Sequence, residues 1–142
     1  MSAELTRQFL DTNVLVYAHD RSAGEKYRRA LNLVEELATR QNGALSIQVL
    51  QEFFVTVTTR LPKPLPLHEA AAIVSDLGAL PIHAPGVSDA LAAIDLHDRL
   101  QVSFGDAMIL RSASVLRCAV VWSEDLAHGR GYDDVEVRNP FT

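Results

Sequence analysis

The chain has 142 residues, of which 48% are hydrophobic and 22% are charged, a composition typical of one soluble globular domain over residues 1–142. No apolar run approaches the roughly 20 residues of a membrane helix, and the N-terminus lacks a secretory signal pattern, so we expect a cytoplasmic protein. The net charge of −5 argues against a surface that attracts nucleic acid everywhere, so any nucleic-acid binding must be local, metal-mediated or partly supplied by a partner.

Hydrophobic periodicity predicts strands that alternate with helices along the chain. The expected strands are residues 9–11, 44–47, 81–84, 119–122 and 135–137, and the last of these is expected at an edge of the sheet. The expected helices are, approximately, residues 14–18, 22–42, 46–60, 67–77, 88–100 and 103–116. This alternation with short connections indicates an α/β fold, a three-layer sandwich with a mainly parallel sheet of about five strands.

Local signals place several helix starts. Ser22 and Glu25 have the spacing of a capping box, and Ser46 and Ser103 are expected N-caps of the helices that follow them. Prolines 62, 64 and 66 predict a stiff connector between two helices. The single Cys118 lies among apolar residues, which favours a small buried side chain over a nucleophile.

Four acidic residues fall where strands end or helices begin. Asp11 ends the first strand, Asp125 follows the strand at 119–122, Glu52 lies in the first turns of a helix, and Asp106 opens another. In a parallel sheet these positions face one rim, where ligands bind. Clustered carboxylates raise one another's pKa unless cations such as Mg²⁺ or Mn²⁺ lie between them, and such ions activate water for attack on phosphorus.

Each acidic residue also has an ordinary structural interpretation. Asp106 could be a helix N-terminal acid favoured by the helix dipole, and Glu52 a solvated helix residue. Asp125 could be a turn residue, and Asp11 with Asn13 could form an Asx turn. The combination favours the metal site, because all four acids fall at one rim of the predicted sheet.

Four segments resemble the motifs of the PIN domain, a family of metal-dependent ribonucleases. The segments, in chain order, are Phe9-Leu10-Asp11-Thr12-Asn13-Val14-Leu15, Ser46-Ile47-Gln48-Val49-Leu50-Gln51-Glu52-Phe53, Ser103-Phe104-Gly105-Asp106-Ala107-Met108-Ile109 and Trp122-Ser123-Glu124-Asp125-Leu126. Asn139-Pro140-Phe141 is also similar to the usual ending of the family. The compact chain is similar to the VapC toxins of bacterial and archaeal toxin–antitoxin pairs.

The resemblance implies a ribonuclease that hydrolyses RNA phosphodiester bonds with metal-activated water. It implies that Asp11, Glu52 and Asp106 bind Mg²⁺ or Mn²⁺ directly and that Asp125 does so directly or through water. Asn13 and Ser123 would orient these carboxylates by hydrogen bonds. Gly105 departs from the family, where a bulky aromatic is common, and Glu124 leaves open which acid of the Glu124-Asp125 pair faces the metal.

The resemblance also implies partners, namely an RNA substrate, a VapB-type antitoxin and a second copy of the chain. Exposed apolar residues on the first two long helices would suit antitoxin docking. Candidate RNA contacts are Lys26, Arg28, Arg29, Arg60, Lys63, His128 and Arg130, for each of which an ordinary surface role has the higher base rate. The alternatives are a PIN-like binding module without catalysis and a receiver-like signalling domain, which the lack of a suitably placed lysine disfavours.

Overall fold

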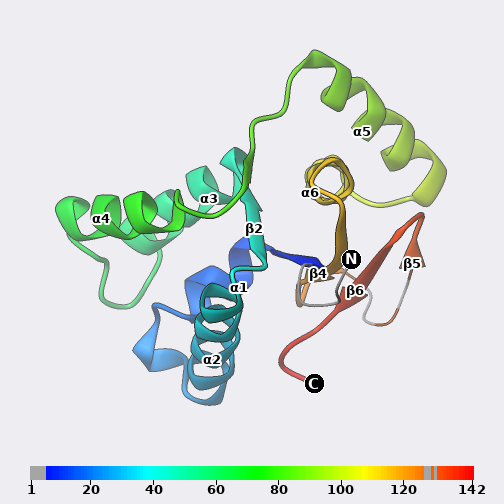
Figure 1. Cartoon of the computed structure of the whole chain (residues 1–142). Helices are drawn as coiled ribbons and strands as arrows, with labels where there is room; N and C mark the ends of the chain where they lie inside the picture. The colour runs from blue at the N-terminus through cyan, green and yellow to red at the C-terminus, as the bar shows by residue number, and fades with distance from the viewer. Residues whose placement is uncertain (1–5, 127–128, 130) are drawn as a thin grey trace.

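The computed structural model describes residues 6–126, Gly129 and residues 131–142. Its strands are β1 (Arg7–Leu10), β2 (Gly43–Ser46), β3 (Ile82–His83), β4 (Cys118–Trp122), β5 (Gly131–Tyr132) and β6 (Val135–Arg138). Its helices are α1 (Thr12–Tyr17), the 3₁₀ helix η2 (Arg21–Ala23), α2 (Glu25–Arg40), α3 (Ile47–Thr59), α4 (Leu67–Leu77), α5 (Val87–Leu100) and α6 (Phe104–Val115). Figure 1 shows the sheet between these helices.

The strands form one sheet in the order β3-β2-β1-β4-β6-β5. Neighbouring strands are parallel from β3 across to β6, and only β5 runs antiparallel to its neighbour. This confirms the predicted α/β fold with a mainly parallel sheet. The chain builds outward from β1 to β2 and β3, and then returns to the other side of β1 with β4. The crevice beyond the ends of β1 and β4 is therefore the topological switch point, where open parallel sheets bind ligands.

The described residues form six strands where the sequence predicted about five, and the predicted edge strand was misplaced. Residues 135–138 form β6, which lies between β4 and β5 and pairs with both. The edge is β5, a two-residue strand at Gly131 and Tyr132. Gly131 was interpreted as part of a loop, because a strand of two residues is too short to show the alternation of polar and apolar positions by which strands are recognised.

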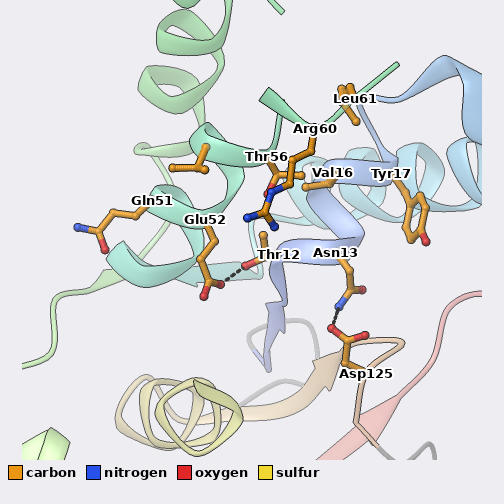
Figure 2. Close-up of a pocket in the computed structure, with 11 residues that line it drawn as sticks. Thr12, Asn13, Val16, Tyr17, Gln51, Glu52, Thr56, Arg60, Leu61 and Asp125 are labelled. Carbon is orange, nitrogen blue, oxygen red and sulfur yellow. Dashed lines mark hydrogen bonds between the residues drawn. The ribbon is translucent and has the colours of Figure 1, made fainter. Parts of the chain in front are cut away.

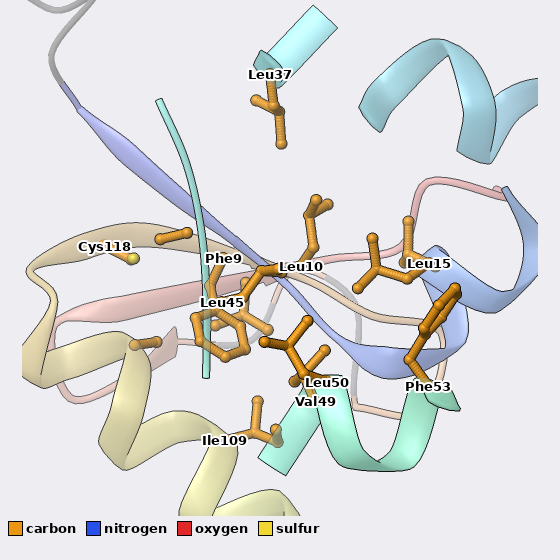
Figure 3. Packing of buried hydrophobic residues seen from close by; sticks show 14 of the residues in the cluster. Phe9, Leu10, Leu15, Leu37, Leu45, Val49, Leu50, Phe53, Ile109 and Cys118 are labelled. Atoms are coloured by element: carbon orange, nitrogen blue, oxygen red, sulfur yellow. The ribbon is translucent and has the colours of Figure 1, made fainter. Parts of the chain in front are cut away.

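The hydrophobic core lies on both faces of β1 and β2. Phe9 and Leu10 of β1 and Leu45 of β2 are almost completely buried. Figure 3 shows Leu37 of α2 on one side of these strands and Ile109 of α6 on the other. Helices therefore cover both faces of the sheet, which is the predicted three-layer arrangement. The ends of the strands are left uncovered. Cys118 is buried in this core, and burial raises its thiol pKa to about 12, as expected for an unreactive side chain.

Two of the three predicted helix caps are confirmed. The Ser46 hydroxyl accepts a hydrogen bond from the backbone N–H of Val49, and the Ser103 hydroxyl accepts one from Asp106. The capping box at Ser22 and Glu25 was wrong. The Asp20 carboxylate accepts hydrogen bonds from both the N–H and the hydroxyl of Ser22, so Ser22 lies in the 3₁₀ helix and α2 begins at Glu25 after Gly24. Two capping signals competed here, and the more N-terminal one prevailed.

A buried polar cluster attaches α6 to its neighbours. His83 of β3 hydrogen-bonds through Nδ1 to the Ser112 hydroxyl of α6, and its Nε2 lies 3.4 Å from Asp89 of α5. Asp89 also accepts a hydrogen bond from Nε of Arg111 at 2.9 Å. This cluster helps to fix the position of α6, whose N-terminus carries Asp106. None of the described helices is long and apolar enough to cross a membrane.

Candidate metal centre

Asp11 lies at the switch point, between the end of β1 and the start of α1. Its backbone N–H donates to the Trp122 carbonyl of β4 at 3.0 Å, which extends the β1–β4 pairing by one residue. Its carboxylate caps α1, because Oδ1 accepts a hydrogen bond from the N–H of Thr12 at 2.7 Å. Oδ2 accepts a hydrogen bond from the Ser123 hydroxyl at 2.8 Å. The residue is only 5% exposed, so the carboxylate is fixed within the protein.

Ser123 and Asn13 connect Asp11 to Asp125 in the loop after β4. The Ser123 hydroxyl accepts a hydrogen bond from the N–H of Asp125 at 3.0 Å. The Asn13 amide Nδ2 donates to Oδ2 of Asp125 at 3.1 Å, and its Oδ1 accepts from the N–H of Glu124 at 3.2 Å. The two ends of β1 and β4 are thereby tied together, and the Asp125 carboxylate is directed toward α1.

Glu52 reaches the same region from α3 (Figure 2). Its Oε1 accepts a hydrogen bond from the Thr12 hydroxyl at 2.7 Å. Its Oε2 lies 3.4 Å from Nε2 of Gln48, which also donates to the Gly105 carbonyl at the start of α6. Gln48 therefore links the two helices that carry Glu52 and Asp106. A Cβ atom at Gly105 would lie 3.9 Å from Gln48 Nε2, so the glycine leaves ordinary contact space beside this link.

Asp106 is the third residue of α6, and its position follows from the Ser103 cap. Burial raises its pKa, and repulsion by Asp125 and by Glu52 raises it further. Burial also raises the pKa of Asp11 to about 6, with smaller contributions from Asp125 and Asp106, against the lowering effect of its two hydrogen bonds. Four carboxylates from four separate chain segments therefore repel one another at one end of the sheet.

The donor set fits a hard divalent cation, because carboxylate oxygens are the ligands that Mg²⁺ and Mn²⁺ prefer and like-charge repulsion is what such an ion relieves. The side chain of Gln48 adds a buried oxygen, Oε1, with no hydrogen-bond partner among the described residues. The positions of these side chains fit an ion less well than their chemistry does. Within residues 6–126, 129 and 131–142, no three His, Cys, Asp or Glu side chains are placed to hold one ion together. Thr12 and Asn13 hold the Glu52 and Asp125 carboxylates in other hydrogen bonds.

The PIN domain family model matches residues 9–131, which span all four carboxylates. The chain belongs to the PIN domain family. This assignment excludes the receiver-like alternative. None of the curated proteins is significantly similar to the chain.

Solved structures share the fold of this PIN domain at low sequence identity. A toxin–antitoxin complex from Klebsiella pneumoniae superimposes with a TM-score of 0.70 at 20% identity, covering 94% of this chain and 98% of that chain. VapBC2 from Rickettsia felis, bound to a promoter DNA fragment, gives a TM-score of 0.64 at 19% identity, with 94% and 98% covered. Mycobacterium tuberculosis VapC20, a toxin that cleaves the sarcin-ricin loop, gives a TM-score of 0.60 at 15% identity. The match covers 80% of this chain and 86% of that chain.

The structure separates the roles of Glu124 and Asp125 in this PIN domain. Glu124 Oε1 forms an ion pair with Nζ of Lys26 at 2.7 Å, whereas Asp125 accepts from Asn13. The geometry thus favours Asp125 as the acid that faces the other carboxylates. Lys26, a candidate RNA contact, forms this ion pair with Glu124 and lies 5.0 Å from the ring centroid of Tyr17. Two further candidates for RNA contact, His128 and Arg130, lie outside the described residues.

A cavity of about 710 Å³ opens beside the carboxylates, and Glu52 and Asp125 line it. Sequence reasoning missed one feature of this cavity, because it gave Thr12 no role although the Thr12 hydroxyl holds Glu52. Arg60 was a candidate RNA contact for which a surface role had the higher base rate, and its side chain points into the cavity in Figure 2. The Gln48 contact had a detectable signal, since Gln48 and Glu52 are four residues apart on one helix.

Proposed function

We propose that this PIN domain is a Mg²⁺- or Mn²⁺-dependent ribonuclease that hydrolyses RNA phosphodiester bonds with metal-activated water. The observation that carries the proposal is the convergence of Asp11, Glu52, Asp106 and Asp125 at the switch point of the sheet, where burial, with a smaller contribution from repulsion, raises the pKa of Asp11 to about 6. A cluster of this kind is destabilising without a cation, so its presence needs a functional reason.

In this proposal Asp11, Glu52 and Asp106 hold the metal directly, and Asp125 contributes directly or through water. The metal supplies polarisation of the phosphate and a lowered pKa for the attacking water. The remaining chemistry is positioning by the chain. Ser123 and the Thr12 N–H fix the orientation of the Asp11 carboxylate, and Asn13 restrains Asp125. The Ser103 cap keeps Asp106 at the entrance of α6.

We further propose that the protein is the toxin of a VapBC-type pair, cytoplasmic and neutralised by a VapB-type antitoxin. The support is the similarity in fold to chains solved in a toxin–antitoxin complex and in VapBC2. Of the two helices expected to expose apolar residues for this docking, only α3 exposes large ones, Ile47 and Val55. The corresponding prediction for α2 was wrong, because its long apolar side chains are at least partly buried.

We also propose a homodimer, and α5 provides the best surface for it. Val87, Leu91 and Ile94 are 79%, 62% and 52% exposed, and their spacing of four and three residues aligns them along one face of the helix. Water-exposed side chains of this size in a continuous row are typical of an interface rather than of a monomer surface.

The deciding experiment compares RNA cleavage by the wild type and by Asp11→Asn, each with Mg²⁺, with Mn²⁺ and with EDTA. We expect metal-dependent cleavage by the wild type and a loss of at least about a thousandfold in the variant, because the substitution removes a ligand charge while keeping the side-chain shape. Circular dichroism of both proteins verifies that the variant is folded. Equal cleavage by both proteins would contradict the nuclease assignment, and RNA binding without cleavage by either would identify a binding module instead.

A further inference from the structure

The cavity beside the carboxylates contains a cation with no partner among the described residues. Arg60 follows the last residue of α3 and lines the cavity together with Glu52, Asp125 and Tyr17. Its guanidinium forms no hydrogen bond or ion pair with any residue that the structure describes, and its backbone N–H is already bonded to the Thr56 carbonyl. By contrast, Lys26, the other cation near this rim, is paired with Glu124. Arg60 is therefore available to an anionic ligand.

The same cavity is also lined by an aromatic ring, Tyr17, that is held in place. Tyr17 packs edge-on against Phe141, with 5.1 Å between ring centroids, and the Lys26 ammonium lies 5.0 Å from its centroid. A hydrogen bond with Glu124 is the largest cause of the raised pKa of the Tyr17 hydroxyl. The ring and its hydroxyl are thus both restrained. This restraint lowers the entropic cost of fixing the side chain when a base stacks on it.

We propose that this cavity is a nucleotide subsite, in which Arg60 binds a phosphate next to the scissile one and Tyr17 stacks on the attached base. A guanidinium presents paired donors that match phosphate oxygens, and aromatic rings stack on any base without reading its sequence. The volume of about 710 Å³ lies within the usual range of small-ligand pockets, so one nucleotide unit can enter. The inference rests on the proposed function, because it places the reacting phosphate at the carboxylates.

An acidic peptide is the competing ligand for a free arginine. RNA is favoured because the cavity combines one cation with an aromatic side chain and an apolar wall that includes Val16 and Leu61. A peptide carboxylate would use the arginine but would leave the restrained ring without a matching group, whereas a nucleotide uses both. The net charge of −5 makes a specific local cation the more necessary for holding an RNA strand.

The test measures binding of a fluorescent single-stranded oligoadenylate of about eight nucleotides by anisotropy in EDTA, over a series of salt concentrations. Arg60→Ala is compared with Arg40→Ala, which removes the same charge from an exposed pair with Glu36 on α2. We expect Arg60→Ala to weaken binding about tenfold and to reduce the salt slope by about 0.7, the value for one lost phosphate contact with a single strand, while Arg40→Ala leaves the slope unchanged.

The second arm tests the ring. Tyr17→Leu is expected to weaken binding about tenfold, whereas Tyr17→Phe, which keeps the ring and removes only the hydroxyl, should bind within about twofold of the wild type. Thermal melting verifies that all four variants are folded. Equal losses in Arg60→Ala and Arg40→Ala, no effect of Tyr17→Leu, or tighter Arg60-dependent binding of oligoglutamate than of oligoadenylate would each overturn the subsite.

Cleavage of the same RNA with Mn²⁺ separates this inference from the proposed function. If the wild type cleaves RNA and the Arg60 and Tyr17 variants bind like the wild type, the nuclease assignment stands and the subsite is refuted. If binding depends on both side chains but the wild type does not cleave, nucleotide binding in the cavity stands and the metal-dependent chemistry is refuted.

Discussion

Asp11→Asn should stabilise the metal-free protein at neutral pH, even though it removes the central residue of the candidate site. Burial and the neighbouring carboxylates raise the pKa of Asp11 from its ordinary value of 3.8 to about 6. The folded protein therefore holds this proton more tightly than the unfolded chain does. Ionising Asp11 destabilises the fold, and the effect is absent below about pH 4, grows as the pH rises, and is complete above about pH 6.

The shift sets the size of the effect. Each pKa unit corresponds to about 1.36 kcal/mol, so the ionised Asp11 destabilises the metal-free fold by about 3 kcal/mol at neutral pH. Asparagine keeps the acceptor for the Thr12 N–H but faces the Ser123 hydroxyl with an amide, which costs about 1 kcal/mol. The variant should thus be about 1 kcal/mol less stable than the wild type at pH 4 and about 2 kcal/mol more stable at pH 7.

Urea unfolding of both proteins in EDTA between pH 4 and pH 8 measures this difference, and groups that titrate equally in both proteins cancel. Adding Mn²⁺ at pH 7 should then stabilise the wild type by about 2.7 kcal/mol at a concentration of 100 times Kd, and the variant by much less. A difference in stability that stays constant with pH, or equal stabilisation of both proteins by Mn²⁺, would refute the reasoning about Asp11.

Two further substitutions test other parts of the structure. Ser123→Ala removes a hydrogen bond that lowers the pKa of Asp11. Urea unfolding should show that the free energy of unfolding falls by about 2 kcal/mol at pH 7 and by less at pH 4, where Asp11 is neutral. A loss of stability independent of pH would contradict this role of Ser123. Leu91→Asp on α5 should convert a dimer to a monomer in light scattering with an unchanged circular dichroism spectrum, while Leu67→Asp, a similarly exposed position on α4, leaves the dimer intact. An unchanged dimer in both would exclude α5 as the interface.

The sequence contained enough information to predict the fold and the approximate location of the four acids. Ser46 and Ser103 marked the starts of α3 and α6 because a capping serine acts within one turn of its own helix. Once a parallel sheet was predicted, the carboxyl ends of its strands were expected at one rim, which placed the four acids there. These inferences need only local patterns and one general rule about sheets.

The contacts within the site could not be predicted in the same way. Lys26 and Glu124 are 98 positions apart, and nothing in either segment indicates that they form an ion pair. The Arg60 side chain enters the cavity because α3 ends at Thr59 and the chain then turns into the proline connector, a direction that depends on tertiary packing. Similarly, the Thr12 hydroxyl meets Glu52 only because α1 and α3 pack together.

The carboxylates are restrained unequally, which fits the metal site that we propose. Asp11 is buried and accepts strong hydrogen bonds at both oxygens, so its position is fixed. Glu52 and Asp125 are exposed, and the short hydrogen bonds that hold them come from Thr12 and Asn13. Breaking either bond costs about 1 kcal/mol, which is less than the attraction between a divalent ion and several carboxylates. In the proposed site, Glu52 and Asp125 would therefore hold an ion beside Asp11 by exchanging these weak hydrogen bonds for metal ligation.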